Sequence, residues 1–147
     1  MAIVNFLASA KRHFRDAELL ASNQREANAG QLYGFCAECG VKAVLIAMGY
    51  PIDNEGSPVE KPQSGEPKIR KHINDLIAIN GQISSYASGR GGAKYLALIP
   101  NINSFNDWSV HHRYYDQQHI PLSLNVWKES AAEIMNMLDM AKLDGVL

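Results

Sequence analysis

The chain contains no long hydrophobic run. Its longest aliphatic stretch is AVLIAM at residues 43–48, far short of the ~20 apolar residues that a membrane-spanning helix needs. The N-terminal sequence MAIVNFLASAKRHFRD becomes charged after too brief an apolar segment to be typical of a signal peptide. Both features predict a cytoplasmic protein that does not insert into a membrane.

Cysteine is scarce, and the two that occur, Cys36 and Cys39, lie in the sequence FCAECG. A CxxC pair can be redox-active or bind metal, but a zinc site needs about four ligands and the chain has no second pair. The flanking residues have helical character, which places both thiols on one face of a helix. Because free cysteine is commonly buried, we expect a packing role for both, with no metal and no cofactor.

The chain also lacks an excess of charge of either sign. It has 14 Lys and Arg against 15 Asp and Glu, a net charge of −1, which argues against a protein that coats nucleic acid with a broad basic surface. Charge is uneven along the chain, however, because residues 51–67 are acidic and the stretch that follows is basic. That asymmetry permits a local cationic groove, although a solvated face is the alternative. The basic stretch contains Lys68, Arg70, Lys71, Arg90 and Lys94.

No alternating strand pattern and no internal repeat is present. Apolar residues instead recur at three- and four-residue steps, and the length suits one domain spanning residues 1–147. We therefore predict an all-α fold, a helical bundle with two long antiparallel helices, short middle helices and a C-terminal helix. A loop at 51–67, with four prolines and two glycines, is expected to be mobile. The first expected helix begins at about Ile3 and ends at a break at Asn23 and Gln24. Further helices are expected over 26–48, 68–79 and 123–143, with short helical pieces within 84–100.

Small residues are unusually frequent in the second expected helix. Each interior glycine costs up to ~1 kcal/mol of helix propensity, so Gly30, Gly34 and Gly40 predict the close approach of a neighbouring helix. Glu38 and Lys42 are four residues apart and are expected to form a buried or half-buried ion pair between the long helices. Trp108 and Trp127 are expected to be core anchors on either side of a polar loop.

Several of these segments together resemble the HEPN superfamily, and in particular small bacterial HEPN-like proteins whose second helix carries an AAEC-xx-K pattern. The residues that carry the resemblance are RHFRDAELL at 12–20 and ANAGQLYGFCAECGVKAVL at 27–45, followed by KHINDL, DWSVHHRY and LDG. The resemblance implies a helical bundle, usually a homodimer, that is associated with RNA or nucleotides and often with toxin–antitoxin or anti-phage systems. Catalytic members of the family cut RNA without metal through an R-x4-6-H motif from each of two copies at a dimer cleft.

The sequence RYYDQQH satisfies that motif with Arg113 and His119. An arginine can hold a phosphodiester with two hydrogen bonds and offset developing charge, and a histidine can exchange protons near neutral pH. Because Pro121 follows closely, both residues are expected in a loop before the last helix. The predicted catalytic residues are therefore Arg113 and His119, and the predicted RNA-binding residues are Tyr114, Tyr115, His112, Lys68, Arg70 and Lys71.

The other histidines have less specific interpretations. His111 and His112 are adjacent and cannot face one way on a regular element, and His13 can hydrogen-bond Asp16 on one helical face. His72 either joins the basic patch or satisfies a backbone carbonyl, and the second is the favoured interpretation.

Two main functions stay open at this point. The first is a metal-independent endoribonuclease of toxin or defence type, and the second is a non-catalytic HEPN-like binding module, such as an immunity, antitoxin or accessory subunit with an operon-encoded partner. A third, a plain structural subunit that docks through the small residues of the second helix, is the least favoured.

Overall fold

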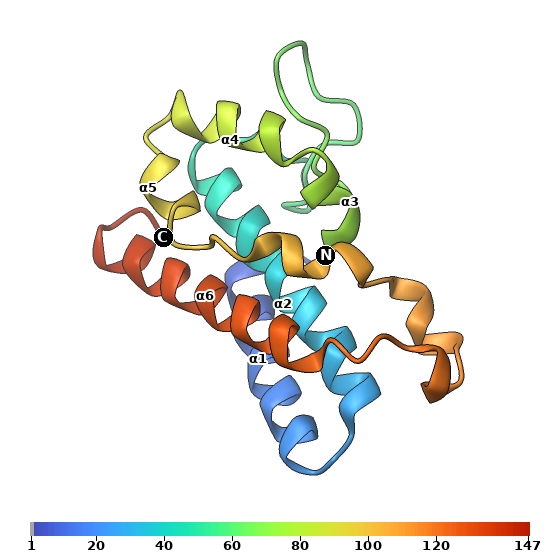
Figure 1. The fold of residues 1–147 in the computed structure, drawn as a ribbon. Coiled ribbons are helices and arrows are strands. Elements are labelled where there is room, and N and C mark those ends of the chain that lie inside the picture. Colours follow the sequence, from blue (N-terminus) through green and yellow to red (C-terminus); the bar gives the residue numbers. More distant parts are fainter. Residues whose placement is uncertain (1) are drawn as a thin grey trace.

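The computed structural model describes residues 2–147, which form six α-helices and three short 3-10 helices, with one long α-helix at the centre (Figure 1). Within residues 2–147 there is no strand, only an isolated bridge between Ile52 and Pro58, so the all-α prediction is confirmed. In the same residues, none of the helices combines the length and the apolar character that crossing a membrane requires. The elements are α1 (Phe6–Ser22), α2 (Glu26–Ala47), α3 (Ile73–Ala78), α4 (Asn80–Ser88), α5 (Ala93–Leu96), η1 (Ile102–Asp107), η2 (Val110–Tyr114), η3 (Gln117–His119) and α6 (Leu124–Leu143).

Helices α1 and α2 form the predicted hairpin of two long helices. The side chain of Asn5 caps α1 by accepting a hydrogen bond of 2.9 Å from the backbone N–H of Ala8. The chain reverses at residues 23–25, where Gln24 has a φ of 57°, so the predicted break is confirmed. Ile3, which was expected to extend the apolar stripe of this helix, lies before α1 and is 75% exposed.

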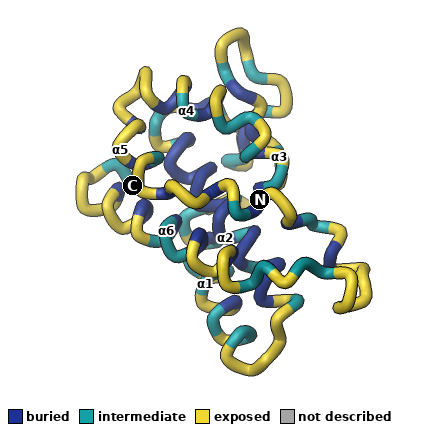
Figure 2. Tube along the Cα trace, viewed as in Figure 1, coloured by how far each residue is buried: buried dark blue, intermediate teal, exposed yellow. Residues whose placement is uncertain are grey.

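Helix α2 is the centre of the molecule. It is buried along most of its length (Figure 2) because α1 packs along one side and α6 along another. The helix ends at Ala47, and Gly49, with a φ of +99°, turns the chain into the left-handed region that a residue with a side chain avoids.

The glycines of α2 mark the positions where large side chains approach its backbone most closely. A Cβ atom at Gly40 would collide with Ile134 of α6, and one at Gly30 would collide with the ring of Trp127. At Gly34 the neighbour is the indole of Trp108, which donates a hydrogen bond of 3.0 Å from Nε1 to the carbonyl of Gly30. The predicted close approach is confirmed, and both tryptophans are core residues as expected.

The predicted third helix is much shorter than expected. Residues 68–72 form no helix, and α3 begins only at Ile73. Pro67 precedes this segment and Ile69 within it is fully buried, while Lys68 and Arg70 on either side of Ile69 are exposed. This alternation is typical of an extended segment, which buries every second side chain, and it overrides the helix propensity of the sequence. Helix α4 then starts at once, at Asn80, where a break was expected.

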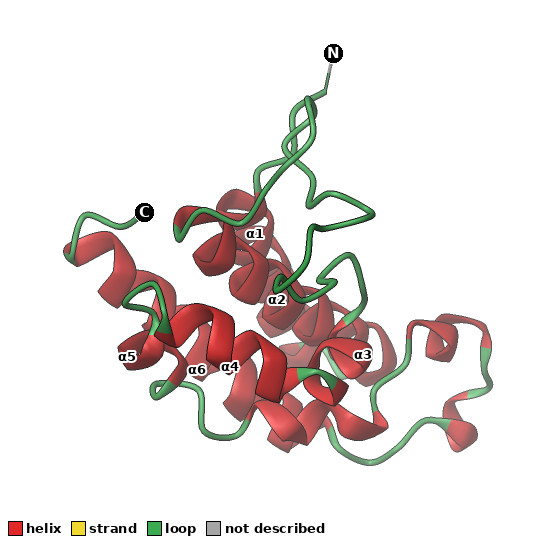
Figure 3. Cartoon of the chain, turned by 90° about the horizontal axis from the view of Figure 1, so that it is seen from above, coloured by secondary structure: helices red, strands yellow, loops and turns green. Residues whose placement is uncertain are grey.

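The loop at 51–67 has its own internal hydrogen bonds. The carboxylate of Asp53 accepts from the backbone N–H groups of Glu55 and Ser57 at 2.9 and 3.0 Å. The N–H of Val4 donates to the carbonyl of Glu55 at 2.7 Å, so the segment before α1 lies along this loop. In Figure 3 the two segments are the green loop traces that run together near the N-terminus.

The chain between α5 and α6 forms the 3-10 helices η1, η2 and η3. The end of η1 is fixed to α6, because Trp127 donates from Nε1 to the carboxylate of Asp107 at 2.9 Å and to the carbonyl of Ser104 at 3.1 Å. Beyond His112 the chain extends away from the bundle, and residues 113–119 are all exposed (Figure 2).

The contact between Gly34 and Trp108 leads to a stability prediction. In Gly34→Ala the new methyl group has to displace a buried indole, so the free energy of unfolding should fall by about 1–3 kcal/mol. Gly81→Ala is the matched control, because Gly81 lies in α4 with open space at its Cβ position, and alanine there should be neutral or stabilising by up to ~1 kcal/mol. Urea denaturation of the two variants measures both effects, and equal midpoints would contradict the close packing of the indole on α2.

Candidate functional site

Three polar side chains form a connected chain across the surface of α2. The ammonium of Lys42 lies 3.1 Å from Oε2 of Glu38, and Nδ1 of His72 lies 2.9 Å from Oε1 of the same carboxylate. Lys42 and Glu38 are only 7% and 13% exposed, so the predicted half-buried ion pair is confirmed, although both partners belong to α2. His72 contacts a carboxylate and not the backbone carbonyl that we expected, because the extended segment 68–72 carries it to Glu38.

Aromatic rings lie beneath and beside this polar chain. The ring of Phe35 has its centroid 6.2 Å from that of His72, 5.7 Å from that of His13 and 5.5 Å from that of Trp108. The rings of His72 and Trp108 are themselves 6.2 Å apart. Burial, and after it the positive charge of Arg12, lowers the pKa of His13 below its ordinary value. His13 is therefore a neutral, ring-packed neighbour of the cluster at neutral pH, and it forms no hydrogen bond with Asp16 in residues 2–147.

The cluster opens into a cleft of about 500 Å³ between α2 and the segment that leads into α3. This volume lies within the range of small-ligand sites, ~300–1,000 Å³. Lys42 is already paired with Glu38, but none of the ion pairs formed within residues 2–147 includes Lys68, Arg70 or Lys71. The cleft therefore has an excess of cations available to a ligand. Its lining residues are Glu38, Lys42, Lys68, Arg70, Lys71, His72 and Asp75.

A buried tyrosine holds the cationic segment in place. The hydroxyl of Tyr50, which is 2% exposed, donates to the carbonyl of Pro67 at 2.5 Å and accepts from the N–H of Ile69 at 3.5 Å. The fully buried side chain of Ile69 anchors the same segment from below. These contacts replace helical hydrogen bonds, and they direct Lys68 and Arg70 outward on either side of Ile69.

The predicted catalytic residues lie outside this cleft. Arg113 is in η2 and His119 is in η3, in the segment before α6 where they were expected, and both are exposed. The guanidinium of Arg113 lies over the ring of Tyr114 at 4.8 Å. No hydrogen bond joins Arg113 to His119 within residues 2–147. Tyr114 and Tyr115 are 71% and 51% exposed, so both rings are accessible.

His112 has a different environment from its neighbours. It is 7% exposed and stacks on Trp127 with the ring planes 25° apart and the centroids 6.1 Å apart, whereas the adjacent His111 is exposed. The two histidines therefore face different ways, as expected. Because the ring of His112 is packed in the core, the RNA contact predicted for it would require η2 to move away from α6.

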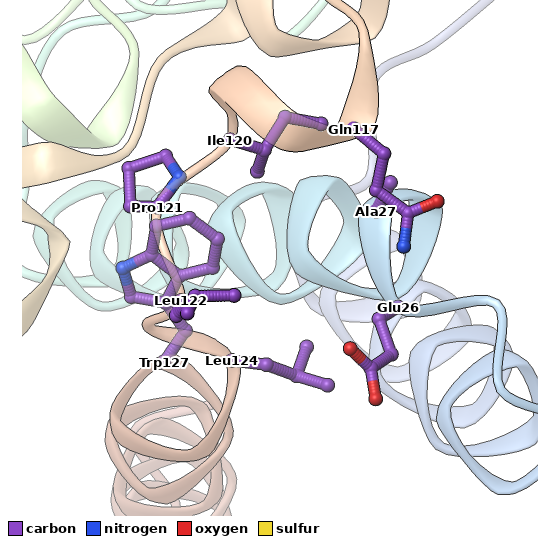
Figure 4. Close-up of a pocket in the computed structure, with 8 residues that line it drawn as sticks. All are labelled: Glu26, Ala27, Gln117, Ile120, Pro121, Leu122, Leu124 and Trp127. Carbon is purple, nitrogen blue, oxygen red and sulfur yellow. The ribbon is translucent and has the colours of Figure 1, made fainter.

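A small pocket lies near the predicted catalytic segment, where the start of α2 meets the start of α6 (Figure 4). Its volume is about 40 Å³, far below the ~300 Å³ at the lower end of small-ligand sites. Neither Arg113 nor His119 lines this pocket, so a molecule bound in it would not contact either residue. The lining residues are Glu26, Ala27, Gln117, Ile120, Pro121, Leu122, Leu124 and Trp127.

The cysteines have the packing role expected of them. Cys36 and Cys39 are free and buried, and Cys36 contacts the sulfur of Met135 at 3.8 Å. Burial raises the pKa of Cys39 to about 12 and also raises the pKa of Cys36, so both remain protonated thiols at neutral pH. Residues 2–147 contain no group of three or more His, Cys, Asp and Glu side chains arranged to hold a metal ion.

Comparisons with family models, with curated proteins and with solved structures find no match to this chain. Its function is therefore inferred from the residues themselves and their geometry.

The sequence alone does not predict the contact between Glu38 and His72, because the two residues are 34 positions apart. One signal for it does exist. The sequence KIR at 68–70 places one apolar residue between two charged ones, which hints at an extended segment but is too short to outweigh the helical pattern of 68–79. An extended segment presents Lys68, Arg70 and His72, which are two residues apart, on one face.

The burial of His112 predicts how stability depends on pH. Burial lowers its pKa below the ordinary value, so below pH ~6.5 the unfolded chain takes up a proton that the folded chain resists. The stabilising effect of the neutral ring is thus present above that pH and is lost as the pH falls. His112→Phe should show a smaller loss of unfolding free energy between about pH 7.5 and pH 5 than the wild type, as measured by urea denaturation. An identical pH dependence in both proteins would contradict this assignment.

Proposed function

We propose that the protein is a HEPN-like module that binds single-stranded RNA, with the phosphate backbone in the cleft between α2 and residues 68–72. One observation carries the proposal: Lys68, Arg70 and Lys71 line a cleft of about 500 Å³ and none of them enters an ion pair within residues 2–147. Cations without internal partners are the groups that replace the counterions of a nucleic acid on binding.

The extended geometry of the segment suits a linear polyanion. In an extended chain every second residue is about 6.6 Å further along, so Lys68 and Arg70 are offered in a row on the same face. An arginine can bind a phosphate with two hydrogen bonds, and a lysine adds a point charge. The net charge of −1 makes this local row, and not the whole surface, the region that attracts RNA.

Exposed aromatic rings favour RNA over an isolated phosphate. Tyr114 and Tyr115 lie on η2 and directly after it, on the segment that follows Trp108, and the ring of Trp108 is a direct neighbour of His72 in the cleft. Stacking of a base on an aromatic side chain contributes about 1–3 kcal/mol and tolerates any sequence. We therefore expect bases of the strand that lie beyond the cleft to stack on these two tyrosines.

The family character and the assembly are part of the proposal. The segments at 12–20 and 27–45, which carry the HEPN resemblance, form the α1–α2 hairpin, and their CAEC-GV-K sequence supplies Glu38 and Lys42 to the cleft. A homodimer and a partner encoded in the same operon, for example an antitoxin, are the assemblies that this resemblance implies.

Charge reversal in the cleft tests RNA binding. The variant with both Lys68→Glu and Arg70→Glu should bind a fluorescent single-stranded RNA at least roughly 10-fold more weakly, and its salt dependence should decrease by about 0.7 in log–log slope for each phosphate that the protein no longer neutralises. Lys61→Glu is the matched control, because it reverses an exposed lysine in the loop at 51–67, outside the cleft lining. Anisotropy titrations measure the affinities. Equal weakening by the control, or no RNA binding by the wild type, would refute the proposal.

A metal-independent endoribonuclease is the second candidate function. The observation that favours it is that Arg113 and His119 are both exposed on consecutive 3-10 helices, so an RNA strand can reach them. A second copy of the chain would have to complete the catalytic centre, because neither the small pocket nor the cleft described above is lined by Arg113 or His119.

For this candidate, His119→Ala should abolish RNA cleavage in the presence of EDTA and relieve the growth arrest caused by expression of the wild type. Cleavage assays and growth curves with both proteins measure the difference. The ribonuclease assignment to this pair is wrong if the variant cleaves and inhibits growth as well as the wild type does.

A further inference from the structure

We infer that Glu38 and His72 form a proton-transfer dyad that cleaves the phosphodiester of an RNA strand bound in the cleft. The inference rests on the proposed binding of RNA, and it assigns to the cleft a reaction that the binding function alone does not require. It also places the reacting centre away from Arg113 and His119.

The geometry of the dyad leaves one imidazole nitrogen available. Nδ1 of His72 contacts Oε1 of Glu38 at 2.9 Å, so this nitrogen carries the hydrogen and donates it to the carboxylate. Nε2, on the opposite side of the ring, then has a free lone pair, and no hydrogen bond within residues 2–147 occupies it. The side chain is 47% exposed and lines the cleft, so a bound strand can reach Nε2.

The carboxylate that orients the histidine is itself held firmly. Glu38 is 13% exposed and belongs to the central helix, and its second oxygen contacts the ammonium of Lys42 at 3.1 Å. Lys42 lies 5.6 Å from the centroid of the Phe6 ring, so its own position is fixed by packing. A proton-transfer group needs such support, because small displacements of the reacting atoms reduce the rate strongly.

The position of His72 in the sequence argues for a role beyond structure. It is the N-cap residue of α3, where Ser, Thr, Asp or Asn would stabilise the helix, and its side chain makes no capping hydrogen bond. The ion pair between Glu38 and Lys42 is complete without it. A histidine at this place gives up a helix cap and turns towards the cleft, which a purely structural role does not require.

The proposed reaction is an internal transesterification that needs no metal and no further reactant. Nε2 of His72 removes the proton from the ribose 2′-hydroxyl, and the 2′-oxygen forms a bond to phosphorus. The bond from phosphorus to the 5′-oxygen breaks, and this oxygen takes a proton from water; the resulting hydroxide then takes the proton from His72. The products are a 2′,3′-cyclic phosphate and a 5′-hydroxyl end, and Arg70 and the lysines of the cleft offset the charge that develops on the phosphoryl oxygens.

The main experiment compares the wild type with His72→Gln on a fluorescent single-stranded RNA in the presence of EDTA. Glutamine can still donate a hydrogen bond to Glu38 but cannot accept the proton, so binding should stay within about twofold while the cleavage rate falls by roughly 10²–10⁴-fold. His111→Gln, which changes an exposed histidine outside the cleft, is the control and should cleave at the wild-type rate. The same RNA with 2′-deoxyribose should bind without being cleaved.

The outcomes separate the inference from the proposed function. A wild type that binds RNA but does not cleave it overturns the dyad and leaves the binding module. A wild type that does not bind RNA overturns the proposed function itself. Full cleavage by His72→Gln, whether or not His119→Ala has lost activity, also overturns the dyad.

A second variant tests Glu38 as a positioning residue and guards against a folding defect in the first. In Glu38→Gln the side-chain amide can offer either its oxygen or its NH2 group to Nδ1, so the ring of His72 is no longer held in one tautomer, and kcat should fall while the KM for RNA stays within about twofold. Thermal melting of each variant shows that it is folded. An unchanged kcat, or a rise in KM that accounts for the whole loss of activity, would overturn the role of Glu38.

Discussion

The packing of the Trp108 indole against Gly34 is the constraint on which the site depends. A side chain at residue 34 would exclude the indole, and the indole in turn donates to the carbonyl of Gly30 and lies beside the ring of His72. One contact therefore fixes two regions relative to α2: the cleft on one side of the tryptophan, and the segment with the exposed tyrosines that follows it. The small residues of the central helix thus serve the site as well as the core.

Within residues 2–147, most of the positive side chains at the opening of the cleft are not neutralised by an acidic partner. Lys42 and Glu38 compensate each other in a half-buried pair, since an unpaired charge at that depth would be costly. Lys68 and Arg70 remain exposed and Lys71 half-buried, on an extended segment that the hydroxyl of Tyr50 and the buried side chain of Ile69 hold in place. A nearly neutral protein can in this way present a strongly cationic cleft.

The sequence predicts the helices well and the site only in part. The bundle can be predicted from the periodic apolar residues, the stop at Gly49 and the small residues of α2. These features depend on local propensity and on one face of each helix. The prediction of helix for the segment 68–72 is wrong, because the burial of Ile69 and the bonds to Tyr50 are tertiary contacts that no local pattern contains. For the same reason the expected partner of His72 is wrong, while the pair Glu38 and Lys42, one helical turn apart, is predicted correctly.

The most direct test of RNA binding in the cleft is to map the contact on the folded protein by NMR, with a ¹⁵N-labelled sample titrated with single-stranded RNA. We expect the largest shifts at the backbone amides of residues 68–72, at the ring nitrogens of His72 and at the indole N–H of Trp108. Shifts confined to residues 113–119, or the absence of any shift, would contradict RNA binding at this site.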